Sequence, residues 1–593
     1  METLVDPPIA TEPSPGAFTP EQRHYLEGFF AGVRSRGLGF RDVALAPAWP
    51  PPPEPPPEKL IFEERIKKEL HPLDAYALLL EHAEANKAPE RENNFRFKWH
   101  GLFHLAPTAD GFMARLRIPG GQLKSYQLRE VAHVAKELAG GFADITTRAN
   151  LQVRVIKPKD APEVLRRIQS VGLHTRGAGA DNVRNLTASP TAGIDPAELI
   201  DVTPMVQQLA QFILNHREFY NLPRKFNVAF DGGGAVSVLD DTNDLGFQAV
   251  QSDLASGSPP PHGVCFRVKL GGVTGHQTFA ADAGLRVTPE DVLKVAVAVM
   301  RVFIRHGDRT DRRKARLKYL LERWGLEKFL AEVEKEFGHP LPRAPRAAEG
   351  PAAAQANASS ATSRGHAHLG VHPQKQTGFS YVGVAVPVGR MLTRQMLRLA
   401  ELAEHYGSGD LRLTVWQNLI IPNVPEAYVE TLKRALLKMG FHWQATPLRG
   451  GLVACTGKAY CKYAATDTKG HALQLAAYLE KKLELDQPLN LHLTGCPNSC
   501  AQHYIGDIGL LGTKVKVAGE TKEGYHVFVG GGFGDHQSVG RQVFTGISFD
   551  QLKPTLERML TGYLRHRTAR ESFLAFTRRH DLNSLQVIFS NDE

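Results

Sequence analysis

The chain repeats itself, and this repetition restricts its possible folds more than any other feature. Segment 118–156, IPGGQLKSYQLREVAHVAKELAGGFADITTRANLQVRVI, aligns without a gap with segment 386–424, VPVGRMLTRQMLRLAELAEHYGSGDLRLTVWQNLIIPNV, at an offset of 268 residues. Both copies predict a helix, a glycine stop and then a β-rich segment. The same offset matches Pro119 with Pro387, Gly121 with Gly389, Ala132 with Ala400, Gly141 with Gly409, Thr146 with Thr414 and Asn150 with Asn418.

A second match follows the first in each half. VKLGGVTG (268–275) resembles VFVGGGFG (527–534) at an offset of 259, and a helix is expected after both. Two matches in the same order indicate a duplicated two-domain unit. Each smaller domain is expected to be an α+β sandwich and each larger one a mixed α/β layer.

Two proline-rich stretches interrupt the globular pattern. APAWPPPPEPPPEK (46–59) predicts an extended spacer, and the Ala/Ser/Pro-rich stretch 339–368 predicts a flexible linker between the halves. The expected division is an N-terminal extension (1–60), a first small unit (61–165), a first large unit (166–338), the linker (339–368), a second small unit (369–445) and a second large unit with C-terminal helices (446–593).

Four of the five cysteines fall within 46 residues, with the spacing C-x5-C, 34 residues and C-x3-C. Four thiolates can hold either Zn²⁺ or an iron–sulfur cluster. Zinc ribbons prefer C-x2-C knuckles, so the wider spacing favours the bulkier inorganic core. Four buried thiols without a ligand are the plain alternative. Cys265, in HGVCFRVKL, is expected to be a packed core thiol.

Charge and composition narrow the partners without identifying them. Lysine and arginine exceed aspartate and glutamate by nine, which fits nucleic acid, an acidic protein, an anionic ligand or only a solvated basic surface. Arginines inside apolar segments such as MARLRIP and LQVRVI suggest a buried anion. The N-terminus does not resemble a secretory signal and no apolar run of about eighteen residues occurs, so we expect a cytoplasmic protein without membrane contact.

GLVACTGKAYC (451–461) and LTGCPNSCAQHYIGDIGLLG (493–512) resemble the paired cysteine motifs of the sirohaem-containing nitrite and sulfite reductases. The resemblance covers nearly the whole chain and includes GFMARLRIPGG, ADITTRANLQVR, ADNVRN, LPRKFN, LGVHPQKQ and LRLTVWQNLIIPNV. It implies an α+β, internally duplicated fold. Two small ferredoxin-like units and two larger mixed α/β units would be related by pseudo-twofold symmetry.

The resemblance also implies two cofactors. A [4Fe–4S] cluster would be held by Cys455, Cys461, Cys496 and Cys500, and Cys500 would in addition bind the sirohaem iron. Sirohaem carries many carboxylates, which would explain arginines in apolar strands. The residues implied as its contacts are Thr146, Arg148, Gln152, Arg154, Arg224 and Gln417.

Four residues align with the family's substrate site: Arg115, Arg184, Lys225 and Asn227. Arginine can bind an anion permanently, while a lysine whose pKa is lowered by nearby cations can donate a proton. The sulfite-specific relatives have K-x-K at this motif, whereas RKFN has K-x-N. Nitrite is a monoanion and sulfite is largely a dianion near neutral pH, so Asn227 favours nitrite.

The expected function is assimilatory nitrite reduction to ammonia by six electrons. The glycine clusters DGGG and VGGGFG lack the dinucleotide-binding pattern, so a separate ferredoxin, steered by the basic surface, is the expected donor. We expect a monomer that binds no nucleic acid. The alternatives are ferredoxin-dependent sulfite reduction, a relative acting in corrinoid biosynthesis, and a basic Cys₄ zinc protein that binds nucleic acid.

Overall fold

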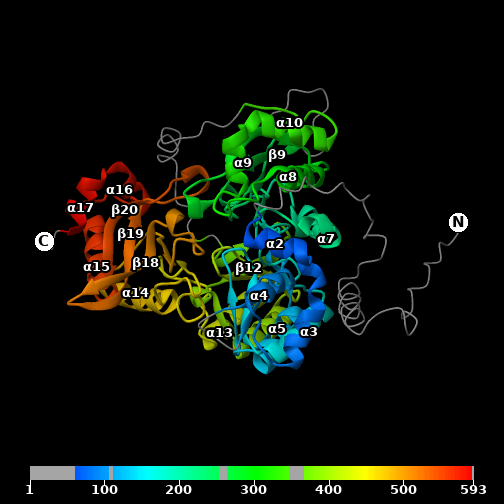
Figure 1. Ribbon diagram of the computed structural model, residues 1–593. Coiled ribbons are helices and arrows are strands. Elements are labelled where there is room, and N and C mark those ends of the chain that lie inside the picture. The colour runs from blue at the N-terminus through cyan, green and yellow to red at the C-terminus, as the bar shows by residue number, and fades with distance from the viewer. Residues whose placement is uncertain (1–59, 106–110, 253–262, 346–365, 367, 591–593) are drawn as a thin grey trace.

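The computed structural model describes residues 60–105, 111–252, 263–345, 366 and 368–590. Figure 1 shows four β-sheets with helices packed around them. The spacer predicted at 46–59 lies outside the described residues, as does most of the linker predicted at 339–368. The beginning of that linker packs against the first large unit. Leu341 is buried in the core of that unit, and the backbone of Arg343 forms a β-bridge with Leu285.

The two small sheets have the same strand order, as the repeat predicts. One sheet has the order β1-β2-β5-β4-β13 and the other β11-β12-β15-β14-β3. The strands of the first are β1 (Leu102–His104), β2 (Phe112–Arg115), β5 (Leu151–Ile156), β4 (Phe142–Ile145) and β13 (Arg390–Leu392). Those of the second are β11 (Gly370–Pro373), β12 (Phe379–Val384), β15 (Leu419–Pro425), β14 (Asp410–Leu413) and β3 (Gln122–Lys124).

The repeats exchange one strand each. β13, from the second repeat, pairs with β4 of the first, while β3, from the first repeat, pairs with β14 of the second. The matching registers are Leu392 opposite Phe142 and Lys124 opposite Asp410, where both members of each pair differ by 268 from their counterparts. Each small sheet is therefore completed by the other half of the chain.

The helix that follows each exchanged strand begins with the same capping contact. The side chain of Gln127 accepts a hydrogen bond from the backbone of Lys124, and that of Gln395 accepts one from Leu392, both at 2.9 Å. Such a contact satisfies a backbone donor that the helix itself leaves free. These helices, α5 (Ser125–Leu138) and α12 (Thr393–Tyr406), pack against each other.

The two large sheets also share one topology, β10-β9-β8-β7-β6 and β16-β17-β18-β19-β20. In each, the first two pairings along the chain are parallel and the next two antiparallel. The strands are β6 (Thr187–Ala188), β7 (Val228–Asp231), β8 (Leu245–Gln251), β9 (Val264–Leu270) and β10 (Ala281–Val287), then β16 (Gly451–Ala454), β17 (Asn490–Thr494), β18 (Ile508–Val517), β19 (Glu520–Val529) and β20 (Arg541–Ser548). The duplicated α+β fold is confirmed.

The remaining helices cover the sheets and join them. Helices α8 to α10 cover the first large sheet, and α14 to α17 surround the second (Figure 1). Their bounds are α2 (Phe62–Glu69), α3 (Tyr76–Glu84), α4 (Arg91–Phe97), α6 (Ala161–Ser170), α7 (Thr203–Asn215), α8 (Val292–His306), α9 (Leu317–Trp324), α10 (Leu326–Phe337), α13 (Glu426–Lys438), α14 (Thr468–Lys482), α15 (Phe549–His566), α16 (Phe573–Arg579) and α17 (Leu582–Ser590).

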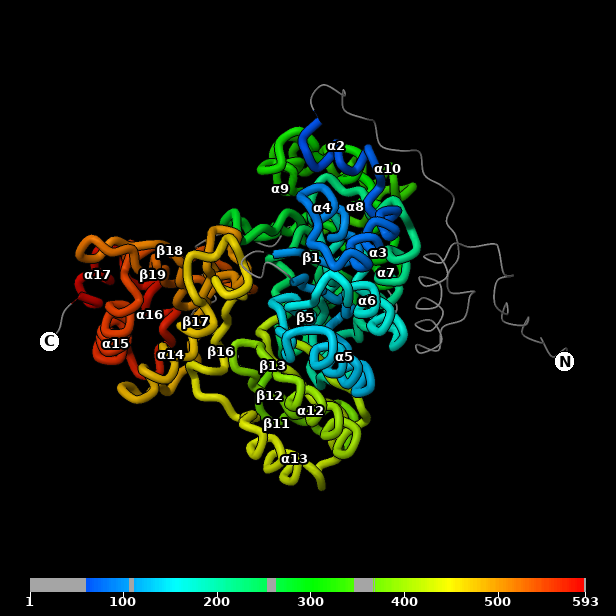
Figure 2. The backbone as a smooth tube through the Cα atoms, turned by 60° about the horizontal axis from the view of Figure 1, so that its bottom comes forward, coloured from blue at the N-terminus to red at the C-terminus, as the bar shows by residue number. Residues whose placement is uncertain are grey.

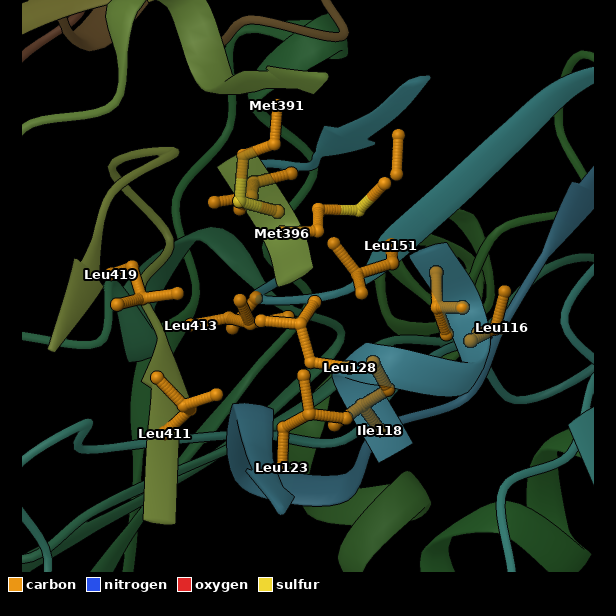
Figure 3. Packing of buried hydrophobic residues seen from close by; sticks show 14 of the residues in the cluster. Leu116, Ile118, Leu123, Leu128, Leu151, Met391, Met396, Leu411, Leu413 and Leu419 are labelled. Atoms are coloured by element: carbon orange, nitrogen blue, oxygen red, sulfur yellow. The ribbon is translucent and has the colours of Figure 1, made fainter. Parts of the chain in front are cut away.

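A single hydrophobic core joins the two small units. It contains Leu123 and Leu128 from the first repeat together with Met391 and Met396 from the second, and Figure 3 shows these side chains meeting. Each large unit has its own core. The small units therefore share one core, and the large units pack around it. One contact joins β16 to the turn Pro387–Gly389, which directly precedes β13, and Figure 2 labels both strands in this region.

Two further expectations concern Cys265 and membrane-spanning helices. Cys265 is fully buried on β9, as predicted for a core thiol. None of the described helices combines the length and apolar character that a membrane span requires.

Candidate active site

The turn between β4 and β5 carries the first site residues. The backbone of Thr146 donates to Asn150 at 2.8 Å, and that of Ala149 donates to Thr146 at 3.1 Å, which gives Ala149 a positive φ of 46°. At this turn the Thr147 hydroxyl donates to the carbonyl oxygen of Cys500 at 2.9 Å. The turn thus lies against the last of the four clustered cysteines.

The cysteines lie at one edge of the second large sheet. Cys455 directly follows β16, and Cys496 and Cys500 follow β17. Because β16 and β17 are parallel neighbours, their carboxyl ends meet at the same edge, where Cys461 lies in the loop before α14. The backbone N–H of Gly495 lies 3.3 Å from the Cys455 sulfur, and the Thr468 hydroxyl lies 3.4 Å from it.

The four thiols influence one another. Burial, together with the smaller influence of Cys500, Cys455 and Cys461, raises the pKa of Cys496 to about 11. Across the described ranges, no three or more His, Cys, Asp or Glu side chains form a group that could hold a single metal ion. Four thiols, one of which, on Cys455, accepts a hydrogen bond from the backbone N–H of Gly495, are ligands suited to an iron–sulfur cluster.

Backbone geometry also fits a cluster loop. A Cβ on Gly495 would lie 2.7 Å from the Cβ of Ala464, and one on Gly457, where φ is +75°, would lie 2.8 Å from the nitrogen of Thr468. Side chains are therefore excluded at both positions, and the two cysteine loops can approach each other closely.

Four cations gather opposite Cys500. Arg115 ends β2, Arg148 lies in the β4–β5 turn, and Arg184 and Lys225 precede β6 and β7. Within the described part of the chain, no carboxylate lies within ion-pair distance of any of the four. The carbonyl oxygen of Ala178 accepts hydrogen bonds from both Arg115 and Arg184, at 3.3 and 3.2 Å.

Burial and mutual repulsion lower the pKa values of these cations. Burial lowers the pKa of Arg115 to about 10, and burial together with the nearby Arg316 lowers that of Arg148 to about 10. The pKa of Lys225 is held well below its usual value by burial and then by Arg316 and Arg184. In all three cases the Cys500 thiolate acts in the opposite direction, so the cations and Cys500 face a common space.

This arrangement fits an anionic macrocycle and a small anion. Buried cations without carboxylate partners are costly unless an anion compensates them. The Nε of Arg184 is buried and has no hydrogen-bond partner among the described atoms. The carboxylates of sirohaem would supply the missing negative charge, and Cys500 would reach its iron.

Asn227 is buried and bonds to other site residues. Its side chain is buried, and its amide oxygen can accept hydrogen bonds from Arg148 at 3.1 Å and Arg316 at 3.2 Å. Its backbone N–H donates to Asp244, whose carboxylate also binds Arg316 at 2.7 Å. Asn227 therefore holds two guanidinium groups in place.

The other implied sirohaem contacts are already bonded to protein groups. Arg154 donates to Asp144 at 3.2 Å, Arg224 lies 3.7 Å from Asp181, and the Gln417 amide bonds to backbone atoms of Ile145 and Ala454. The remaining two bond locally, because Gln152 accepts from Arg154 and the hydroxyl of Thr146 accepts from the backbone of Arg148. The structure thus places Arg148 with the unpaired cations and the rest around them.

The sequence pointed to neither Arg316 nor Asp181. Arg316 lies in the basic run RTDRRKARLK, where nothing distinguishes a buried arginine from an exposed one. Asp181 lies within the ADNVRN motif and is fully buried, with Arg312 bound through both carboxylate oxygens at 2.8 and 2.9 Å. Its place in that motif was the only available signal.

Comparison with known families covers most of the chain. The family described as nitrite and sulphite reductase 4Fe-4S domain matches residues 179–341 and 449–583. The family described as nitrite/sulfite reductase ferredoxin-like half domain matches residues 104–171 and 372–439. Each family matches twice, once in each half, in agreement with the duplicated sheets.

Individual relatives agree with these matches. The chain is 40% identical over 485 residues to the ferredoxin–nitrite reductase of Synechococcus elongatus, covering 80% of this chain and 90% of that protein. It is 36% identical to the chloroplastic ferredoxin–nitrite reductase of Spinacia oleracea, covering 84% of each. The solved structure of Mycobacterium tuberculosis NirA matches with a TM-score of 0.81 and 30% identity, covering 89% of this chain and 98% of that one. The chain belongs to the nitrite and sulphite reductase family, a family of oxidoreductases that carry a [4Fe–4S] centre.

Proposed function

We propose that this chain is an assimilatory nitrite reductase, which reduces nitrite to ammonia by six electrons with reduced ferredoxin as the donor. The observation that carries the proposal is the group of four half-buried cations opposite Cys500, none of which has a carboxylate within ion-pair distance in the described part of the chain. Relatives named ferredoxin–nitrite reductase support nitrite as the substrate, among them an assimilatory ferredoxin-dependent nitrite reductase of Haloferax mediterranei at 32% identity.

The four cysteines would hold the [4Fe–4S] cluster, and Cys500 would also bind the sirohaem iron. When bound, the cluster would pass on electrons from the ferredoxin, and the sirohaem would supply an iron for nitrite. Arg148 is placed to bind a sirohaem carboxylate, with Arg154 and Arg224 as supporting contacts held by Asp144 and Asp181. Thr146, Gln152 and Gln417 fix the backbone around them.

Substrate binding falls to Arg115 and Arg184. Their shared hydrogen bonds to the carbonyl of Ala178 keep the two guanidinium groups close together, which suits a small anion with two oxygen atoms. Arginine stays protonated at neutral pH even when its pKa falls to about 10, as it does for Arg115, so Arg115 retains the charge that stabilises the oxygens.

Lys225 is the candidate proton donor. A lysine whose pKa lies well below its usual value releases a proton more readily than an exposed lysine does. Asn227 would act indirectly, because it orients Arg148 beside the substrate and keeps the net charge lower than a lysine would.

The net positive charge of the chain would attract the donor. Ferredoxins tend to be acidic, and an excess of nine basic residues would speed their approach. High salt should therefore slow ferredoxin-driven turnover more than turnover driven by a small artificial donor. We propose the cytoplasm as the compartment, and a monomer that binds no nucleic acid.

The deciding experiment compares nitrite and sulfite as substrates of the purified protein containing both cofactors. A single reduced donor should be used for both, and kcat/KM measured for each. We expect a preference for nitrite. A preference for sulfite would replace the proposal with sulfite reduction, and a colourless protein that contains zinc would exclude both reactions.

A further inference from the structure

A buried ionic group lies behind the cysteine loop, outside the residues assigned to the substrate. At its centre is Asp144 on β4, which is 3% exposed. Its carboxylate accepts hydrogen bonds from Arg390, at 2.9 and 3.2 Å, and from Arg154, at 3.2 Å. The ammonium of Lys469 lies 3.7 Å from it. These four residues are named the Asp144 group below.

The strand exchange assembles this group. Asp144 and Arg154 belong to the first repeat, Arg390 lies on the exchanged strand β13, and Lys469 lies on α14 of the second large unit. The register of β13 on β4 sets Arg390 directly opposite Asp144. Lys469 also donates to the carbonyl oxygen of Val388, two residues before Arg390. Three separate parts of the fold therefore hold these charged side chains in position.

The Asp144 group contacts the cysteine loop through neighbours of its cysteines. Arg154 donates to the hydroxyl of Thr456 at 2.6 Å, next to Cys455. Arg154 and Arg390 lie over the ring of Tyr460, next to Cys461, at 5.9 and 5.4 Å from its centre.

The second contact passes through α14. Lys469 follows Thr468, whose hydroxyl donates to the carbonyl oxygen of Cys455 at 2.7 Å and lies 3.4 Å from its sulfur. Burial is the main influence that lowers the pKa of Lys469, Asp144 offsets it, and the Cys455 thiolate raises the pKa further. The ammonium of Lys469 is thus within electrostatic reach of a cluster ligand.

Three cations surround one carboxylate, so the group carries an excess of positive charge. The side chains of Asp144, Arg154 and Lys469 are only 4, 4 and 7% exposed, which leaves little solvent to screen them. An iron–sulfur cluster becomes more negative when it is reduced, and nearby positive charge stabilises that state. The excess should therefore make reduction of the cluster easier.

We propose that the Asp144 group sets the reduction potential of the iron–sulfur cluster held by the four cysteines, raising it through its excess positive charge. The inference rests on the proposed function, since it takes the [4Fe–4S] cluster as the group bound by those cysteines. Asp144, Arg390 and Lys469 act through the field that they produce, and none of them needs to touch the substrate.

The test is a redox titration of the cluster in the holoenzyme, followed by EPR of the reduced state. Asp144→Asn removes the anion at nearly constant shape and should shift the midpoint potential to a more positive value. Lys469→Met removes a cation from α14 and should shift it to a more negative value. Lys482→Met, at the exposed end of the same helix, should leave it unchanged.

A purely structural role would not shift the midpoint potential in opposite directions in Asp144→Asn and Lys469→Met. Shifts of one sign in both variants, or no shift, would overturn the proposal. If either buried variant loses its iron, Arg390→Gln decides instead, because Arg390 is partly exposed and its loss should also lower the potential. A wild-type protein without a cluster signal would refute the proposed function, whereas a normal cluster with unshifted variants would refute only this inference.

Discussion

The hydroxyl of Thr147 and the carbonyl oxygen of Cys500 are joined by a 2.9 Å hydrogen bond across 353 residues of sequence. This contact ties the turn that carries Arg148 to the last cysteine. It therefore fixes the position of the turn whose Arg148 would bind a sirohaem carboxylate relative to Cys500, which would bind the sirohaem iron.

Cys500→Ser should uncouple the two cofactors, because a serine hydroxyl binds iron far more weakly than a thiolate. We expect nitrite turnover to fall by at least about a hundredfold, which corresponds to about 2.7 kcal/mol. Turnover should be measured together with iron, acid-labile sulfide and haem absorption. Cys265→Ala, in the core of β9, is the matched control and should keep both cofactors. Near-normal turnover of Cys500→Ser would remove Cys500 from the bridging position.

Lys225→Arg should separate charge from proton donation. The lowered pKa of Lys225 means that its protonated fraction declines as pH rises through that lowered value, so the wild-type kcat should decline on the alkaline side. Arginine keeps its charge there but is a poor proton donor. The variant should bind nitrite with a similar KM and have a lower kcat without that decline. An unchanged alkaline limb would assign proton delivery to another group.

Asn227→Lys should move the preference from nitrite toward sulfite. One added unit charge at ~4 Å in a medium of effective dielectric constant ~20 is worth about 4 kcal/mol before desolvation, so a change of about tenfold in the ratio of kcat/KM values is a modest expectation. The lysine would also face Arg148 and Arg316, which now bind the Asn227 oxygen. Asn227→Met, which removes that oxygen without adding charge, separates the two effects. Equal ratios in both variants would show that charge at this position does not select the substrate.

Asp181→Asn should loosen the loops that carry the substrate cations. Burial acts to raise the pKa of Asp181, but Arg312 and Lys67 outweigh it and hold that pKa below the usual value. A carboxylate with a lowered pKa stabilises the fold above its unfolded pKa of about 4 and loses this effect as pH falls through the folded value.

The variant should lose roughly 3–5 kcal/mol of unfolding free energy at pH 7. The difference from wild type should shrink as pH falls below ~4. Denaturant unfolding at several pH values, with the KM for nitrite, measures both effects. Asp308→Asn, in the same loop as Arg312 but bonded, among the described residues, only to Thr310 and Asp311, is the control. A difference that does not change with pH would mean that Asp181 acts only by shape.

Gly121→Ala and Gly389→Ala should destabilise the protein to a similar extent. A Cβ on Gly121 would lie 2.5 Å from the carbonyl oxygen of Leu413, and one on Gly389 would lie 2.7 Å from that of Ile145. The two contact residues again differ by 268. Adding the cost of a positive φ to the clash, we expect losses of about 2–4 kcal/mol each. Gly141→Ala, where φ is +80° but nothing lies within 4 Å, should cost only about 1 kcal/mol. Equal losses in all three variants would make φ alone responsible.

The sequence predicted the duplicated fold because glycines and prolines mark positions where the backbone accepts few residues. Gly121 and Gly389 share a φ of +70°, which explains why both have remained recognisable in the alignment of the halves. The strand exchange could not be predicted, because β3 and β13 are three residues long and their partners lie far away in sequence. Nothing within so short a segment specifies which edge it will join.

The site was predictable where rare residue types fall in motifs, as with the cysteines and with RKFN. It was not predictable where geometry separates residues that are close in sequence. Arg148 and Arg154 lie in one segment, yet the turn directs Arg148 to Asn243, whereas Arg154 on β5 meets Asp144. The ion pairs that organise the site join distant segments, such as Arg312 with Asp181, and no local pattern records them.

The exchange of β3 and β13 determines what the two halves of the chain would expose as separate fragments. A polypeptide ending after the first large unit would present β4 as an open edge and β3 as an unused strand, and the second half would present the reciprocal pair. Each fragment thus carries the piece that the other lacks. Two separately synthesised halves would be suited to fragment complementation, with the dimer interface already encoded in the duplicated sequence.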